Sequence, residues 1–357
     1  MSEVRGAAIE DAPVWVLDDV RGAPATAIGI AERLGVPFRR IPLTWNWMAP
    51  VTSLARRGTL IGLAQPGGRG AEDRAPAFTP AVSLLAPPPG GEGPRLVISS
   101  GARSAPVALW LKSRFACPVV HCATPSPWPG ALLAPLGGLL RAESYDMLVV
   151  PAQDRPPRQD RVFPVLGAPH RVSPLVLHHA AAAWAERLAH LPRPHVVLLV
   201  GGPVRGMDMP PAMAHALGRK VARLALRQGG SVLASTSRRT GAEASDALAA
   251  GLGRAMHVVY RWGEPGENPY LGFLASADAI VVTADSTAML AEACATDASV
   301  LVALPELAGP RQRRLVSALA QTGHIRPLRD DLAPWGRPRL DEAGRVAAEI
   351  HRRFPLD

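Results

Sequence analysis

The sequence predicts an α/β protein built on parallel sheets that helices cover on both faces. Short runs rich in Val, Ile and Leu alternate with longer amphipathic stretches along the chain. Most of these runs are apolar throughout, which is typical of strands buried on both faces of a parallel sheet. The strand candidates are VWVLDD, RLVISSG, PVVHCA, DMLVVP and RVFPVLG in the first half, and HVVLLVGG, SVLASTS, MHVVYRW, AIVVTAD and SVLVALP in the second.

The two series of strand candidates indicate two domains. A chain of 357 residues with 48% hydrophobic content is long enough for two domains of typical size. We place the linker at GAPHRVSP, which separates the two series. The predicted boundaries are 1–168 for the first domain, 169–335 for the second and 336–357 for a closing amphipathic helix. In that helix, apolar residues recur at helical spacing: Leu340, Ala343, Ala347, Ile350 and Phe354.

Three regions are excluded from regular structure or from membrane spans. The stretch between Leu63 and Arg95 is rich in Gly and Pro, so we expect a long surface loop there. The N-terminus has acidic residues and no apolar centre, unlike a signal peptide. PWPGALLAPLGGLL is broken by Pro and Gly and is shorter than the ~18 to 20 residues of a span. We therefore expect no transmembrane segment, while a peripheral contact with a membrane surface stays open.

Charge and cysteine content give further limits. The formal charge is +9, but almost every basic residue is Arg and these are spread along the chain, so we expect no nucleic-acid partner. The densest cluster, Arg311 to Arg314, fits a solvated helix face. Cys117, Cys122 and Cys294 form no CxxC pair, and we expect reduced, buried thiols in a cytoplasmic protein.

The sequence lacks the common motifs of several enzyme classes. It has no GxGxxG after the first strand, which disfavours a nicotinamide enzyme or a sugar epimerase, and no GxxxxGK[ST], GxSxG or HExxH. No Asp-x-Asp pair is present to hold a catalytic metal, so we expect neither metal nor cofactor. His178 and His179 are neighbours on a predicted helix and point about 100° apart, and we expect both to be solvated. His121 ends a strand and fits a core histidine better than a site residue.

Polar loops follow four consecutive strand candidates of the second domain. In an open parallel sheet ligands bind outside the carboxyl ends of the strands, and all four loops would share that edge. Glycines allow close approach of a ligand, arginines can pair with phosphate, and a helix N-terminus favours an anion. Single loops of this kind also occur as ordinary turns and caps. The candidate donor-binding residues in these loops are Gly201, Gly202, Arg205, Ser237, Arg238, Arg239, Asn268, Asp285, Ser286 and Thr287.

Three carboxylates complete the candidate site. Glu292 lies about two helical turns past Asp285, where it can accept hydrogen bonds from the hydroxyls of a ribose. An exposed helical Glu is the alternative. Asp18 and Asp19 end the first strand, where one of them could deprotonate an acceptor hydroxyl as a catalytic base. Turn-forming aspartates are the alternative for this pair.

The segment ADAIVVTADSTAMLAEACATDASVLVALP resembles the donor site of glycosyltransferases with the two-Rossmann-domain GT-B architecture. GGPVRG, TSRRTG, NPYLGFLASADAIVVTADS and AEACAT are more specifically similar to the family named after the plant mitochondrial-fission factor "elongated mitochondria", which has many bacterial members. WVLDDVRG, RLVISSGARSAPVALWLK and DMLVVPAQD extend the resemblance over nearly the whole chain. Thr26 and Gln153 depart from it, since the family usually has Gln and His there.

The resemblance implies two Rossmann-like domains facing a cleft, with the acceptor on the first domain and a nucleoside diphosphate sugar on the second. It implies metal-independent transfer of a sugar from that donor to an acceptor, which could belong to the cell envelope. The alternative is a GT-B-like nucleotide-binding or protein-interaction scaffold without catalysis.

Overall fold

A computed structural model of the chain describes residues 12–19, 24–49, 58–64, 85–87, 91–122, 144–156, 158–202, 209–329 and 331–356. Several features discussed above lie outside these ranges. They are the first 11 residues, most of the Gly- and Pro-rich stretch, the segment PWPGALLAPLGGLL and Arg205.

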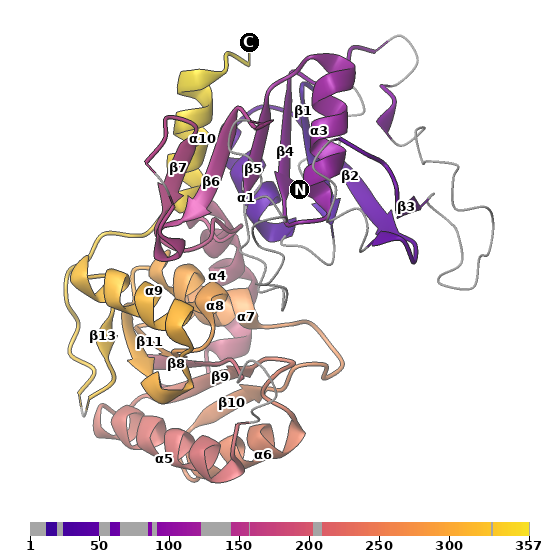
Figure 1. Ribbon diagram of the computed structural model, residues 1–357. Helices are drawn as coiled ribbons and strands as arrows, with labels where there is room; N and C mark the ends of the chain where they lie inside the picture. Colours follow the sequence, from indigo (N-terminus) through magenta and orange to yellow (C-terminus); the bar gives the residue numbers. More distant parts are fainter. Residues whose placement is uncertain are drawn as a thin grey trace. The chain divides into compact units, whose positions relative to one another are not determined.

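The chain forms two compact units, each built on its own sheet (Figure 1). Unit 1 comprises 1–165, 169–171 and 342–357, and unit 2 comprises 166–168 and 172–341. The pairing of the described strands is parallel throughout except between the second and third strands. The predicted α/β class with two parallel-sheet domains is therefore confirmed.

Unit 1 has a sheet of order β3-β2-β1-β4-β5-β6-β7, with helices on both faces. Its C-terminal helix α10 packs against α1, so the chain returns to unit 1 after completing unit 2. The elements are β1 (Val14–Asp19), α1 (Pro24–Leu34), β2 (Phe38–Trp45), β3 (Leu63–Ala64), β4 (Leu96–Ser100), α3 (Ser104–Phe115), β5 (Val119–Cys122), β6 (Met147–Pro151), the 3-10 helix η4 (Ala152–Asp154), β7 (Val162–Val165) and α10 (Glu342–Arg353).

Unit 2 has a fully parallel sheet of order β10-β9-β8-β11-β12-β13. The elements are α4 (Pro174–Leu188), β8 (His195–Val200), α5 (Pro211–Arg227), β9 (Ser231–Thr236), α6 (Ala242–Leu252), β10 (His257–Tyr260), α7 (Tyr270–Ser276), β11 (Ala279–Thr283), α8 (Thr287–Cys294), β12 (Ser299–Ala303), the 3-10 helix η5 (Pro305–Leu307), α9 (Pro310–Gln321) and β13 (Arg326–Pro327).

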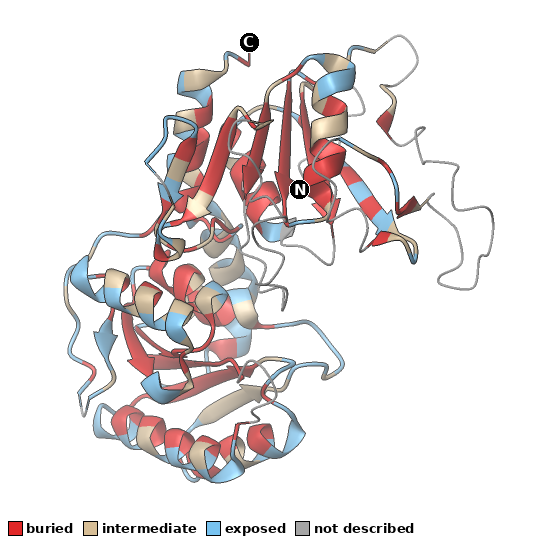
Figure 2. Ribbon diagram, viewed as in Figure 1, coloured by how far each residue is buried: buried red, intermediate tan, exposed pale blue. Residues whose placement is uncertain are grey.

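The core of unit 2 shows why its strands are apolar without alternation. On β8, Val197 and Leu199 pack on the face covered by α4, α7, α8 and α9, while Val196 and Leu198 pack on the face covered by α5 and α6. Both faces of the sheet are therefore covered by helices, and the central strands β8 and β11 are buried along their whole length (Figure 2). This packing fixes the strand ends, and with them the loops that carry the polar residues.

The strand β2 was not among the strand candidates. Its sequence FRRIPLTW places polar or half-exposed side chains between buried ones, and its outer neighbour β3 has two residues. The alternating pattern reflects one solvated face near the edge of the sheet. Within the described residues, every helix is too short or too polar to cross a membrane.

Candidate functional site

The sheet of unit 2 changes direction of winding between β8 and β11. From β8 the chain continues outward through β9 and β10, then returns to β11 on the other side of β8. The loops after β8 and β11 therefore diverge to opposite faces at one point of the carboxyl edge, which is where open α/β sheets bind ligands. Gly201 and Gly202 follow β8, and Ala284 to Ser286 follow β11.

The Gly201–Gly202 turn is held by side chains from the loop after β11. The backbone N–H of Gly201 donates to Thr283 Oγ1 at 2.9 Å, and that of Gly202 donates to Asp285 Oδ2 at 2.8 Å. A Cβ at Gly201 would lie 2.2 Å from Asp285 Oδ2, and a Cβ at Gly202 would lie 2.3 Å from the carbonyl oxygen of Arg239. Both glycines are thus required by close packing within the protein, and this packing explains them before any ligand is considered.

Thr240 joins the loop after β9 to the same turn. Its hydroxyl lies within hydrogen-bonding distance of the carbonyl oxygens of Val200, at 3.0 Å, and Gly201. The backbone N–H of Ser237 donates to Thr240 Oγ1 at 2.9 Å. The three loops after β8, β9 and β11 therefore form one hydrogen-bonded cluster, of which the sequence had indicated every loop but not Thr240 or Thr283.

Asp285 lies inside this cluster. Its side chain is 0% exposed, and Arg239, 39% exposed, places Nη2 3.6 Å from Oδ2. The second carboxylate oxygen, Oδ1, is buried without a hydrogen-bond partner among the described residues. Asp285 therefore stabilises the glycine turn and pairs with Arg239; its contact with a donor stays a prediction. Arg238, beside it, is exposed.

Ser286 and Thr287 begin α8, in line with the expected position at a helix N-terminus. Ser286 is the N-cap residue and is buried, and its side chain makes no capping hydrogen bond; Thr287 is half-buried in the first turn. The backbone N–H groups of the first turn of any α-helix lack intrahelical partners, and with the helix dipole they favour an anion. This end of α8 is therefore the part of the cluster with the chemistry to hold a phosphate.

Glu292 contacts Tyr270 instead of lying on a solvated helix face. The Tyr270 hydroxyl donates to Glu292 Oε2 at 2.5 Å, and both side chains are half-buried. Burial raises the pKa of Glu292, although the hydrogen bond from Tyr270 acts in the opposite direction. Burial and the neighbouring Glu292 charge raise the pKa of Tyr270 well above its usual range. Asn268 is exposed, and its Oδ1 accepts from the Tyr270 N–H at 3.0 Å, which joins the loop after β10 to the start of α7.

The two candidate bases of unit 1 lie at a second point of reversal, between β1 and β4. Asp18 Oδ2 accepts from Arg40 Nη2 at 2.5 Å, and Asp19 Oδ1 accepts from the indole N–H of Trp45 at 2.9 Å. Both carboxylates are buried. The partners come from β2, one of the strands missing from the strand candidates, so the sequence offered no signal for either contact.

The histidines and cysteines singled out in the sequence have the predicted exposure. His178 and His179 are exposed, and the cysteines are buried and free. His121 is fully buried; its Nδ1 lies 2.8 Å from Ser99 Oγ, while Nε2 has no partner among the described residues. Desolvation lowers the pKa of His121 to about 3.

The described residues contain no cluster of three or more His, Cys, Asp or Glu side chains that could hold a metal ion.

Comparison with known proteins assigns the sequence to a family. The family model described as mitochondrial fission ELM1 matches residues 22–354. The mitochondrial fission protein ELM1 of Arabidopsis thaliana is 33% identical over 207 residues, which cover 56% of this chain and 47% of that protein. The matched region thus spans about half the length of this curated relative.

Solved structures of similar fold include UDP-GlcNAc 2-epimerases. The enzyme from Methanocaldococcus jannaschii has a TM-score of 0.53 at 14% identity, over 95% of this chain and 98% of that chain. The enzyme from Neisseria meningitidis bound to UDP-GlcNAc has a TM-score of 0.49 at 14% identity, over 96% of this chain and 100% of that chain. The first of these similarities shows a shared fold and confirms the predicted GT-B-like architecture.

Proposed function

The chain belongs to the mitochondrial fission ELM1 family, and on that premise we propose that it binds a nucleoside diphosphate sugar and transfers the sugar to a hydroxyl acceptor. The donor binds at the carboxyl edge of the unit 2 sheet, and the acceptor at the corresponding edge of unit 1. The observation that carries the proposal is the junction of the glycine turn and the start of α8 at the β8–β11 reversal, with Glu292 in the second turn of the same helix.

The chemistry of this edge suits the parts of such a donor. The first turn of α8 favours the diphosphate through its N–H groups and the helix dipole. Arg239 brings a half-exposed cation to the same cluster and offsets the buried charge of Asp285. Glu292 offers a carboxylate to the hydroxyls of the ribose; Tyr270 donates to Oε2, so Oε1 is the oxygen proposed to face the ribose. The similarity in fold to an enzyme named for UDP-GlcNAc supports a nucleotide sugar as the ligand class.

In the transfer, the acceptor oxygen attacks the anomeric carbon of the sugar, and the bond between that carbon and the diphosphate oxygen breaks. The nucleoside diphosphate leaves, and the acceptor proton passes to a carboxylate of unit 1. Asp19 and Asp18 are the proposed bases. The expected reaction needs no metal, because the helix N-terminus and the arginine supply positive charge to the leaving diphosphate.

A second candidate function is nucleotide-sugar binding without transfer. One observation favours it: the Arg40 guanidinium lies 2.5 Å from Asp18 Oδ2 and already occupies this carboxylate oxygen, which would otherwise face an acceptor hydroxyl. In that case the protein would act as a GT-B-like scaffold whose ligand regulates an interaction.

Calorimetry with uridine, guanosine, adenosine, cytidine and thymidine diphosphates and their common sugars tests the shared first step. Absence of binding to all of them at millimolar concentration would refute both candidates. For a sugar donor that does bind, release of free nucleoside diphosphate in the presence of hydroxyl acceptors separates them. Transfer predicts release that Asp19→Asn or Asp18→Asn reduces at least a hundredfold with unchanged donor affinity, whereas a scaffold gives no release from the wild type.

A further inference from the structure

The C-terminal end of helix α8 is held by an arginine from a distant part of the sequence. Its N-terminal end carries Ser286 and Thr287 of the proposed donor site, and the helix is eight residues long. At its C-terminal end, the last carbonyl groups accept from residues outside the helix: Ala293 accepts from Thr296, and Cys294 from Leu340. These carbonyls meet Arg337, which lies more than forty residues further along the chain.

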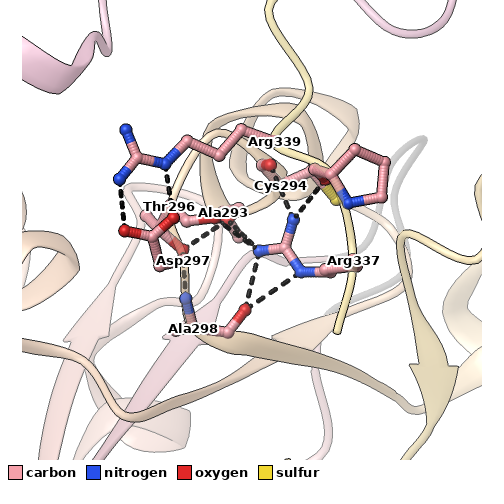
Figure 3. Close-up of polar contacts among 8 residues, drawn as sticks. Ala293, Cys294, Thr296, Asp297, Ala298, Arg337 and Arg339 are labelled. Atoms are coloured by element: carbon pink, nitrogen blue, oxygen red, sulfur yellow. Dashed lines mark hydrogen bonds and ion pairs between the residues drawn. The ribbon is translucent and has the colours of Figure 1, made fainter. Parts of the chain in front are cut away.

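The guanidinium of Arg337 forms hydrogen bonds with several backbone carbonyl oxygens at the C-terminal end of α8 (Figure 3). Nη1 donates to Cys294 at 2.8 Å, and Nη2 lies 3.3 Å from the carbonyl oxygen of Ala293; both acceptors are in the last turn of α8. Nη2 also donates to Thr296 at 2.8 Å, and Nη2 and Nε donate to Ala298 at 2.7 and 3.1 Å, in the turn that leads to β12. Arg337 therefore joins the last turn of α8 to the turn that precedes β12.

The charge of Arg337 has an unusual set of partners. Within the described part of the chain it forms no ion pair, and its acceptors are backbone carbonyls. Burial lowers the pKa of its guanidinium. A cation at the C-terminus of a helix is favoured by the helix dipole, and only the planar fork of Arg can reach several carbonyls at once.

The segment around Arg337 is also where the chain leaves unit 2. The backbone N–H of Leu340 donates to the Cys294 carbonyl at 2.9 Å, and the chain enters unit 1 after Asp341. The earlier passage from unit 1 to unit 2 touches the same helix, because a Cβ placed on Gly167 would lie 3.2 Å from the Ala291 side chain. Ala291 and Cys294 are three residues apart and share a face of α8.

We propose that Arg337 is a positioning residue for the donor site: by fixing the C-terminal end of α8, it sets the position of the helix start and of Glu292 toward the nucleotide. The inference rests on the proposed function, since it assigns Arg337 a role in that site. The helix is about 12 Å long at 1.5 Å per residue, so a small change of tilt at one end moves the other. Hydrogen bonds weaken as their geometry departs from the preferred distance and angle, so such a movement weakens contacts with the nucleotide.

The test measures the affinity of the full chain for uridine diphosphate, with the other four common nucleoside diphosphates tested in parallel. We expect Arg337→Gln to weaken binding about tenfold, and Arg337→Lys to restore part of it, because Lys keeps the charge without the fork. The matched control is Arg339→Gln. Arg339 lies two residues away, is exposed and pairs with the exposed Asp297, and its replacement should leave affinity unchanged (Figure 3).

Two further variants separate positioning from loss of stability. Val221→Ala weakens the core on the α5 face of unit 2, away from α8, and should leave affinity unchanged at temperatures where it is folded. In a Glu292→Ala background, Arg337→Gln should cost less affinity than it does in the wild type, because one of the two groups that it positions is already gone. If Arg337→Gln does not fold, Arg337→Lys carries the same comparison.

The outcomes are distinguishable. Wild-type affinity in folded Arg337→Gln and Arg337→Lys proteins overturns the positioning role and leaves the proposed function standing. An equal loss with and without Glu292 overturns it as well. Failure of the wild type to bind any of the five nucleotides overturns the proposed function, and the inference with it.

Discussion

Replacement of Glu292 separates its structural contact from its proposed contact with ligand. The hydroxyl of Tyr270 donates to Glu292 Oε2 at 2.5 Å in a half-buried site. Removing one partner leaves the other polar group unsatisfied in a partly buried site, which costs ~1.5 to 3 kcal/mol, so Glu292→Ala should destabilise unit 2 by about that amount. For a domain of this size the melting temperature should fall by about 3 to 12 °C. Tyr270→Phe breaks the same bond and should cause a similar fall.

The effects on affinity should differ between these two variants. Glu292→Ala removes the acceptor for the ribose hydroxyls and should weaken binding of a nucleoside diphosphate by about ten- to a hundredfold. Tyr270→Phe keeps the carboxylate and should bind within about threefold of the wild type. With the 2′,3′-dideoxy analogue, the wild type and Glu292→Ala should bind equally. Calorimetry at a temperature where all variants are folded measures these differences, and equal affinity of wild type and Glu292→Ala for the ribonucleotide would refute the ribose contact.

The same carboxyl group predicts opposite pH dependences of stability and binding. Because burial raises the pKa of Glu292 in the folded state, its protonated form is favoured there over the unfolded chain. Its contribution to stability is therefore fully present below its ordinary pKa and is lost as pH rises through the raised pKa. Affinity for the ribonucleotide should rise over that window, since the ionised carboxylate is the stronger acceptor. Glu292→Gln should lack both dependences, which denaturation and calorimetry across the pH range would show.

Two other predictions concern packing and buried charge. Gly202→Ala should destabilise unit 2 by about 3 kcal/mol, because its Cβ would lie 2.3 Å from the backbone oxygen of Arg239, whereas Gly336→Ala, with nothing within 4 Å, should change stability by no more than about 0.5 kcal/mol in urea denaturation. Desolvation lowers the pKa of His121 from 6.5 to about 3, so the stability of unit 1 should fall as pH drops through that interval. His121→Phe should lack this part of the acid sensitivity, and an unchanged pH profile would contradict the buried neutral state.

Much of the fold could be predicted from the sequence, because strands that are buried on both faces of a sheet have uninterrupted apolar sequences. Every strand candidate is a strand of the structure, and the loops after β8, β9, β10 and β11 share one edge because parallel pairing requires it. The strand β2 was not predicted because its solvated positions interrupt the apolar run. The contacts of Asp18 with Arg40 and of Asp19 with Trp45 escaped for the same reason, since both partners lie on β2.

The roles of individual site residues were less accessible from the sequence. Helical spacing placed Glu292 about two turns past Asp285, but its partner Tyr270 lies on another helix, and spacing along one helix says nothing about that contact. Thr240 and Thr283 stabilise the glycine turn through hydrogen bonds across strands. Such contacts depend on which strand ends meet, and that follows from the strand order, which the sequence does not state.

The electrostatic balance at the start of α8 limits how a diphosphate can bind there. Asp285 brings a buried negative charge to the point where the helix dipole favours an anion, and its side chain is 0% exposed. A phosphate nearby would be repelled unless a cation offsets that charge, and Arg239, with Nη2 3.6 Å from Asp285 Oδ2, is placed to do so. If the phosphate drew Arg239 fully away, the carboxylate would lose this partner in a buried position, which is costly. The arginine must therefore contact both groups at once, and its half-exposed position beside Asp285 is compatible with such a bridge.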